Sequence, residues 1–267
     1  MSSSTPSHLE MPHSVGTTIW QFGPSEYRDV SYHGCTQPQV VLAGVLRFVK
    51  PGDLVVDPMC GSGTAAIALA YHGIRTVNLD ISANAIQIAK ARAANRGLTR
   101  YASFSLADAR RLPLASSTAS FAFFHPPYYD MVRYAAENGS SPEKDLSMCA
   151  SYDEFLESIR HVIAEISRVL LPSGGCCLQI GDRLSRGEYL PVGHDLYNLF
   201  RLEGFSLFEE NVKLPPCQAL DAIGRSKRWR DRQNFLGRQQ LRNLIQHDYV
   251  MIFMKSRTPL RTWVFAP

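Results

Sequence analysis

The sequence predicts an α/β fold in which a mainly parallel sheet of seven strands, with one antiparallel edge strand, carries helices on both faces. Short apolar runs rich in β-branched residues alternate with helix-like segments of about 10–20 residues along most of the chain. Such alternation is typical of right-handed crossovers between parallel strands. The last two strand-like runs have no convincing crossover helix between them, and this favours one antiparallel strand at the edge.

The expected strands are the apolar runs 54–58, 76–80, 103–108, 121–125, 174–182, 205–214 and 249–256. The expected helices cover 36–50, 65–73, 81–97, 151–171 and 191–203. Ser151 and Glu154 form a capping-box pattern at the start of the fourth helix. The first strand runs into a glycine turn that opens a helix, which is typical of a Rossmann-like sheet.

The composition predicts a soluble globular protein. Of the 267 residues, 45% are hydrophobic and 19% are charged, and the formal net charge is +4; these proportions are ordinary. No apolar stretch is long enough to span a membrane, and residues 1–16 lack the apolar core of a secretory signal. The six cysteines form no CxxC pair, so neither a metal site nor a disulfide framework is expected, and a reducing cytoplasm fits.

The turn after the first strand is the first candidate site. It reads Asp57-Pro58-Met59-Cys60-Gly61-Ser62-Gly63-Thr64. Glycines let the backbone approach a ligand closely, and open α/β sheets bind ligands outside the carboxyl ends of their strands. Asp80 ends the second strand, where a carboxylate accepts from ribose hydroxyls, and Asp108 ends the third, where it can accept from an adenine amino group. A tight structural turn would explain the glycines alone, but the three acids predict a nucleoside-containing ligand.

A second candidate site follows the fourth strand, in the tetrapeptide His125-Pro126-Pro127-Tyr128. A glycine turn of this kind followed by a strand-end Pro-Pro-Tyr resembles the DNA amino-methyltransferase superfamily, which modifies N4 of cytosine or N6 of adenine. His125 makes this chain an HPPY variant, since members usually carry Asp, Asn or Ser there. The resemblance covers nearly the whole chain and implies S-adenosyl-L-methionine as the cofactor. It assigns the cofactor to residues 57–64 as named above and to Asp80, Ile81, Asp108, Ala109 and Gln37.

The resemblance also implies how the tetrapeptide acts. The lone pair of an exocyclic amino nitrogen is delocalised into its ring, so acceptors that grip the N–H groups make the nitrogen a better nucleophile. These acceptors are the side chain of His125 and the carbonyl of Pro126, whose direction the prolines, Pro127 included, hold fixed. Tyr128 would stack on a base extruded from the duplex. No metal and no covalent intermediate are needed.

The domain prediction places one methyltransferase domain over residues 17–256. Residues 1–16 are expected to be a disordered leader and residues 257–267 a C-terminal tail. No separate recognition domain is visible, so substrate recognition is assigned to two inserts in the domain, 129–150 and 213–246.

The second insert contains a basic segment, residues 225–242, with seven Lys or Arg and one Asp. Cations interleaved with aromatic rings are typical of nucleic-acid binding, although a solvated helix face would explain the charges equally well. The predicted nucleic-acid contacts are Tyr129, Arg133, Arg225, Lys227, Arg228, Trp229, Arg230 and Arg232.

The leading hypothesis is a site-specific DNA methyltransferase that acts on cytosine N4, with adenine N6 as the next choice. A partner restriction endonuclease stays an open alternative. The nearest rival is an RNA base amino-methyltransferase, because the same pocket would serve both polymers. A catalytically inactive nucleic-acid-binding relative is the third hypothesis, suggested by His125. Asp182, which ends the fifth strand, either serves the substrate cleft or forms a turn.

Overall fold

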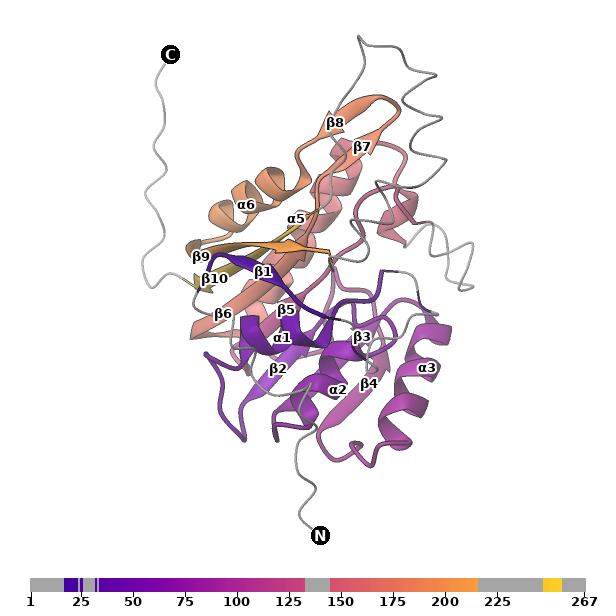
Figure 1. The fold of residues 1–267 in the computed structure, drawn as a ribbon, viewed down its shortest axis with the longest axis vertical. Helices are drawn as coiled ribbons and strands as arrows, with labels where there is room; N and C mark the ends of the chain where they lie inside the picture. The colour runs from indigo at the N-terminus through magenta and orange to yellow at the C-terminus, as the bar shows by residue number, and fades with distance from the viewer. Residues whose placement is uncertain are drawn as a thin grey trace.

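The computed structural model describes residues 17–23, 25, 32, 34–132, 145–215 and 247–255. Within them, eight strands form one sheet in the order β1-β9-β10-β6-β5-β2-β3-β4 (Figure 1). These strands are β1 (Ile19–Gln21), β2 (Leu54–Asp57), β3 (Arg75–Asp80), β4 (Ala102–Leu106), β5 (Ala119–Phe124), β6 (Leu170–Ile180), β9 (Phe205–Leu214) and β10 (Asp248–Lys255). A separate hairpin consists of β7 (Arg183–Ser185) and β8 (Glu188–Leu190). The helices are α1 (Pro38–Val45), α2 (Thr64–Ala70), α3 (Ala83–Ala94), the short 3-10 helix η4 (Leu146–Met148), α5 (Tyr152–Val169) and α6 (Val192–Leu202).

The predicted fold class is confirmed, with eight strands in the sheet rather than seven. The additional strand is β1, which pairs parallel with β9. Its three residues are too few to give a periodic pattern, and the sequence therefore places them in an irregular aromatic segment. β10 is antiparallel to both of its neighbours, β6 and β9. It lies near the edge where an antiparallel strand was predicted, but third from that edge, because β9 and β1 lie outside it.

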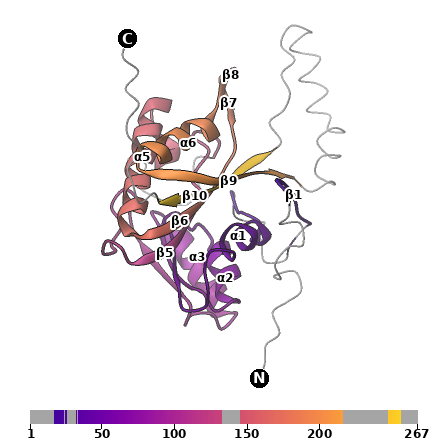
Figure 2. The ribbon, with the colours of Figure 1, turned by 90° about the vertical axis from the view of Figure 1, so that its left-hand side faces the viewer.

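Helices cover the sheet on both faces (Figure 2). α5 and α6 pack on one face, and α1 and α2 pack on the other. Successive residues of a strand point to opposite faces, so each central strand contributes to both cores. In β6, Cys176 belongs to the α5–α6 core and Cys177 to the α1–α2 core, and both are fully buried. Burial on both faces explains why the central strands read as continuous apolar runs.

Helix α5 begins as its capping pattern predicts. The hydroxyl of Ser151 accepts a hydrogen bond from the N–H of Glu154 (3.1 Å), and the carboxylate of Glu154 accepts one from the N–H of Ala150 (2.8 Å). These bonds satisfy backbone donors that a helix start leaves without partners. The helix thereby carries its apolar stripe onto the sheet from the first turn onward.

The predicted single domain over residues 17–256 stays a prediction. The leader 1–16, the tail 257–267 and most of the inserts 129–150 and 213–246 lie outside the described residues. So do seven of the predicted nucleic-acid contacts: Arg133, Arg225, Lys227, Arg228, Trp229, Arg230 and Arg232. Among the helices that the structure describes, none has the length and apolar character needed to cross a membrane.

Candidate active site

The glycine turn between β2 and α2 requires both of its glycines. Gly61 and Gly63 have φ angles of +50° and +79°, in the left-handed region that side chains disfavour. A Cβ on Gly63 would lie 2.9 Å from the Cβ of Ala89 in α3, and one on Gly61 would lie 2.9 Å from the ring of Tyr32. The turn therefore packs closely against α3 and against Tyr32, and α2 begins directly after it.

Two carboxyl groups at the ends of β2 and β3 flank this turn. Asp80 accepts hydrogen bonds from the N–H groups of Gly61 (2.8 Å) and Ser82 (2.9 Å). Asp57 accepts one from the N–H of Met59 (3.1 Å). Burial raises the pKa of Asp57 to about 8, against the lowering effect of the Met59 bond, and the charge of Asp80 adds to the rise. Burial likewise raises the pKa of Asp80. The turn thus gathers buried acceptors that a ligand with hydrogen-bond donors would satisfy.

Asp108, beyond the end of β4, is already paired within the protein. The guanidinium of Arg110 donates to both of its carboxylate oxygens, with Nε at 3.0 Å from Oδ1 and a terminal nitrogen at 2.7 Å from Oδ2. The backbone N–H of Arg110 donates to Oδ1 as well (3.0 Å). The hydrogen bond to Asp108 raises the pKa of Arg110. Asp108 is therefore a poorer acceptor for a ligand than its strand-end position suggests.

The tetrapeptide follows β5 directly. The Nε2 atom of His125 lies 3.2 Å from the hydroxyl of Tyr128, and the two rings meet edge to face. A Cβ on Gly181 would lie 2.8 Å from the ring of Tyr128 and 3.0 Å from a carboxylate oxygen of Asp248, so these two groups flank the same point of the chain. Burial is the largest single influence on Asp248 and opposes its ionisation, but the charge and hydrogen bond of Lys213 at 2.9 Å, the charge of His125 and the hydrogen bond from Gln179 together lower the pKa of Asp248. His125 therefore lies within the field of a carboxylate.

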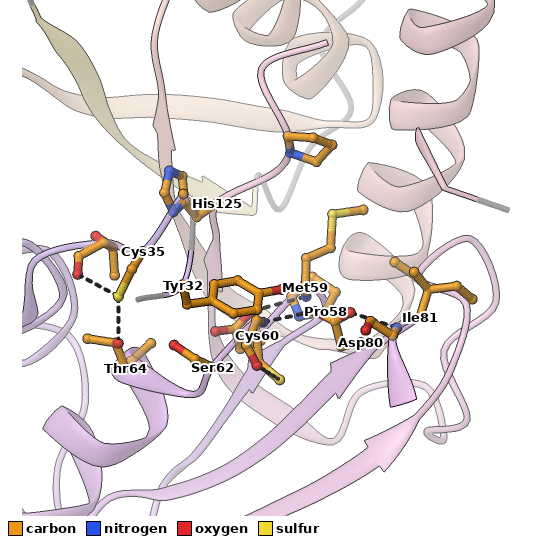
Figure 3. A pocket seen from close by; sticks show the side chains of 18 of the residues that line it. Tyr32, Cys35, Pro58, Met59, Cys60, Ser62, Thr64, Asp80, Ile81 and His125 are labelled. Atoms are coloured by element: carbon orange, nitrogen blue, oxygen red, sulfur yellow. Dashed lines mark hydrogen bonds between the residues drawn. The ribbon is translucent and has the colours of Figure 1, made fainter. Parts of the chain in front are cut away.

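One cavity joins the two candidate sites (Figure 3). His125 lies on one side of it, and Pro58, Met59, Cys60 and Asp80 lie on the other, while Pro127 also lines it. The predicted site residues on its wall are Asp57, Pro58, Met59, Cys60, Gly61, Ser62, Thr64, Asp80, Ile81, Asp108, Ala109, His125 and Pro127. The two turns thus face one space, which is the arrangement that transfer between two bound reactants requires.

Four predicted site residues are absent from the described wall of the cavity: Gln37, Gly63, Pro126 and Tyr128. Gly63 shapes the turn, and Tyr128 contacts the cavity residue His125. The amide of Gln37 donates to the carbonyl of Gly23 at 3.4 Å. Their place is in support of the wall.

Tyr129 contradicts its predicted contact with nucleic acid. Its side chain is 8% exposed and packs against Tyr152 and Phe155 of α5, with ring centroids 5.5 and 5.6 Å apart. A ring enclosed in the core cannot meet a polymer at the surface. Tyr129 is therefore a packing residue, and the prediction for it is wrong.

Asp182 organises the chain around the β7–β8 hairpin. It is 3% exposed and accepts hydrogen bonds from the N–H of Gly193 (2.9 Å) and from the hydroxyls of Tyr189 and Tyr249. Of the two readings that the sequence leaves open, these contacts favour the structural one.

Sequence reasoning missed part of the cavity wall. The missed residues are Tyr32, Gly34, Cys35, Thr36, Ala65, Ser82, Phe123, Asp145 and Leu146. Ala65 and Ser82 adjoin predicted residues, so extending each motif by one position would have found them. Residues 32–36 come from an irregular segment before α1 and residues 145–146 from η4, and no periodicity marks either.

The glycine turn and the strand-end acids lie in a part of the chain that has known relatives. Residues 55–136 match the family model described as a methyltransferase domain. The predicted cofactor is confirmed as S-adenosyl-L-methionine. The residues present fit it, since the cavity beside the glycine turn is lined by the carboxylate of Asp80, which suits ribose hydroxyls.

Two curated relatives match parts of the chain. A 2-heptyl-1-hydroxyquinolin-4(1H)-one methyltransferase of Mycobacteroides abscessus is 40% identical over 72 residues, which are 27% of this chain and 31% of that protein. A tRNA (guanine(10)-N2)-dimethyltransferase of Methanothermobacter thermautotrophicus is 30% identical over 139 residues, which are 52% of this chain and 38% of that protein. The chain thus spans only about a third of the length of these relatives.

The fold is shared with solved methyltransferases. The structure of geranyl diphosphate methyltransferase in complex with SAM superposes with a TM-score of 0.55 at 16% identity, covering 82% of this chain and 84% of that one. At this identity the likeness shows the fold alone.

The resemblance to the DNA amino-methyltransferase superfamily is corrected by these comparisons. The matched family model is the methyltransferase domain, and the two curated relatives are named for methylating a small molecule and a tRNA. The coarser prediction, a methyltransferase domain that uses S-adenosylmethionine, holds. DNA binding, restriction-modification and base flipping are not supported. The misleading signal is the Pro-Pro-Tyr turn after β5, on which the resemblance to DNA methyltransferases largely rested.

Proposed function

We propose that this protein transfers a methyl group from S-adenosylmethionine to an exocyclic amino nitrogen of an RNA base. The observation that carries the proposal is the shared cavity, which His125 and Pro127 line together with the glycine turn. The name of the tRNA (guanine(10)-N2)-dimethyltransferase, 30% identical over 139 residues, supports both the polymer and the type of acceptor atom.

The part of the cavity lined by His125 and Pro127 is called the acceptor side, because the methyl acceptor is proposed to bind there. His125 supplies the chemistry on this side. A neutral imidazole nitrogen accepts one hydrogen bond, and an amino N–H held in this way directs the nitrogen lone pair away from its ring. The bound cofactor supplies an electrophilic methyl group on a sulfonium. The protein then contributes mainly by fixing the amino nitrogen on the line of attack.

Tyr128 acts through His125 in this proposal. Its hydroxyl lies 3.2 Å from Nε2 of the imidazole, and its ring packs beside Gly181. A ring held there orients the imidazole, so Tyr128 is a positioning residue. This role replaces the stacking on an extruded base that the sequence suggests.

A network of hydrogen-bonded side chains supports the acceptor side. The hydroxyl of Thr36, on the cavity wall, donates to the side-chain oxygen of Gln179, whose amide donates to Asp248 at 3.0 Å. Lys213 donates to the same oxygen of Asp248. Satisfied buried networks of this kind hold one geometry, which suits a site that must place a nucleophile accurately.

The compartment is part of the same proposal. Five cysteines of the described chain carry free thiols, three of them buried. Free thiols support a reducing, cytoplasmic location.

The test is methyl transfer from radiolabelled S-adenosylmethionine to three acceptors in parallel: total tRNA, duplex DNA and planar aromatic small molecules. Labelled polymer is digested to nucleosides, and the methylated base is identified by mass. We expect label on a base amino group of tRNA, and none with the His125→Ala variant. Label confined to DNA or to the small molecules would overturn the proposal.

An inactive binding relative is distinguished in the same assay. It would bind S-adenosylhomocysteine in calorimetry, retain tRNA on a filter, and transfer no label. That outcome would also overturn the proposal, while leaving the cofactor assignment in place.

A further inference from the structure

Asp145 contributes an unsatisfied carboxylate oxygen to the cavity wall. The residue precedes η4 and is 6% exposed. Its Oδ1 atom accepts from the N–H and the hydroxyl of Ser147, at 2.9 and 2.7 Å. Its Oδ2 atom is buried and receives no hydrogen bond from any described residue. One oxygen thus caps the short helix, and the other is left for something else.

A buried carboxylate oxygen without a donor is unfavourable and rare in folded proteins. It persists where a bound ligand supplies the donor. Asp145 lines the same cavity as Asp80 and His125. The Oδ2 atom is therefore an acceptor that awaits a ligand N–H or O–H.

The neighbours of Asp145 place it on the cofactor side of the cavity. Its charge contributes to the raised pKa of Asp80, the acid expected to hold the ribose. It also contributes to the raised pKa of Cys149, a group that senses Arg110 beside β4. Asp145 thus lines the cavity together with the strand-end acids Asp80 and Asp108, and apolar Ile81 and Leu146 line it as well.

The acid expected to take the adenine amino group is engaged elsewhere. Both oxygens of Asp108 accept from Arg110, at 3.0 and 2.7 Å. A ligand would have to compete with a charged, two-pronged partner for them. Asp145 offers a buried oxygen with no such competitor.

We infer that Asp145 accepts a hydrogen bond from the exocyclic amino group of the cofactor's adenine and so selects adenine, the role that the sequence assigns to Asp108. The inference rests on the cofactor and not on the proposed RNA substrate. A binding experiment with no methyl acceptor therefore tests it alone.

Asp145→Asn is the informative variant, because the amide oxygen can still cap Ser147 while an N–H₂ group replaces the free oxygen. Calorimetry measures the Kd of S-adenosylhomocysteine and of S-inosylhomocysteine, whose base carries an oxygen in place of the amino group. The protein should prefer the adenosine compound. The Kd of S-inosylhomocysteine divided by that of S-adenosylhomocysteine measures this preference. In Asp145→Asn this Kd ratio should fall by at least about tenfold, because the amide can donate to the inosine oxygen.

Asp108→Asn is the matched control, and its Kd ratio should stay within about twofold of the unmodified protein. An unchanged ratio in Asp145→Asn, or a fall in Asp108→Asn instead, would overturn the inference. The Tm of cofactor-free Asp145→Asn should be equal to or above that of the unmodified protein, because the unsatisfied charge is removed. A lower Tm together with an unchanged ratio would assign Asp145 a structural role only.

Discussion

The two sides of the cavity satisfy their polar groups in different ways. On the glycine-turn side, the carboxylates accept from backbone N–H groups, Asp57 from Met59 and Asp80 from Ser82, each two residues away, and Asp80 also from Gly61, 19 residues away. On the acceptor side, side chains pair across long stretches of sequence. Thr36 and Gln179 are 143 residues apart.

This difference separates a site formed by a local sequence motif from a site formed only when the sheet is assembled. The glycine-turn side is formed by two short segments, the turn after β2 and the end of β3, and it is the side on which the cofactor is predicted to bind. The acceptor side exists only after β6, β9 and β10 have paired. Substitutions on the first side should therefore alter cofactor binding or local charge, and substitutions on the second should alter transfer.

The largest effect should come from the acceptor side, with His125→Ala. Loss of the imidazole acceptor should lower kcat/KM for methyl transfer roughly a thousandfold, about 4 kcal/mol. The Kd of S-adenosylhomocysteine should stay within about twofold. Transfer assays and calorimetry on one preparation measure both. Equal losses in binding and transfer would erase the distinction between the two sides.

The next effect concerns stability on the glycine-turn side. Burial raises the pKa of Asp57 to about 8, from 3.8 for an ordinary aspartate side chain in water. Between these values the folded state holds a proton that the unfolded state has lost, so stability falls as pH rises. Asp57→Asn keeps an acceptor for Met59 and removes this dependence. Its advantage in the free energy of unfolding should grow from pH 4 to 8, by at most about 1.4 kcal/mol per pH unit, and reach about 4 kcal/mol near pH 7.

Urea denaturation at pH 4, 6 and 8 measures this difference. A constant difference across the three pH values would show that Asp57 titrates as an ordinary exposed carboxyl. Because Asn retains the hydrogen bond to Met59, a loss of that contact cannot explain a gain in stability.

A smaller effect is expected for Asp80→Asn. The amide can accept from only one oxygen, so a contact to Gly61, to Ser82 or to the ribose must weaken. The Kd of S-adenosylhomocysteine should rise about tenfold, about 1.4 kcal/mol. Transfer at saturating cofactor should change less than twofold, and a large loss there would mean that Asp80 also serves the acceptor side.

The local side of this comparison is also the side that the sequence predicted well. The strand ends at Asp57 and Asp80 and the turn at Gly61 were found because apolar runs and glycines mark them directly. All but one of the eight residues from Asp57 to Thr64 line the cavity. β1 was not predicted because three residues carry no periodicity. Asp145 was not predicted as a site residue because a lone acid before a short turn resembles any loop residue.

The acceptor side was predicted only in part. His125 and Pro127 lie on the cavity wall as expected, but the supporting network through Gln179 and Asp248 depends on pairing between β6 and β10. No sequence pattern reports such a pairing. The same limit applies to the substrate, because the tetrapeptide predicts only the type of acceptor atom, an amino nitrogen, and leaves the molecule that carries it open.

The smallest effect should come from Tyr189→Phe in β8. Asp182 would lose one hydroxyl donor and keep Tyr249 and the N–H of Gly193. The free energy of unfolding should fall by less than about 1 kcal/mol, measured in urea. Tyr249→Phe serves as the matched variant. A loss above about 3 kcal/mol for either would mean that this network is not redundant.

The adjacent thiols of Cys176 and Cys177 can report separately on the local opening of the two cores of the molecule. They are neighbours in the chain but lie in opposite cores, and burial raises the pKa of both. An alkylating reagent reaches either one only when its own layer opens, since the thiolate is the reactive form. Peptide mapping after timed alkylation gives the rate of modification at each cysteine. Equal rates would show that the α5–α6 layer and the α1–α2 layer open together, and different rates would show that they open independently.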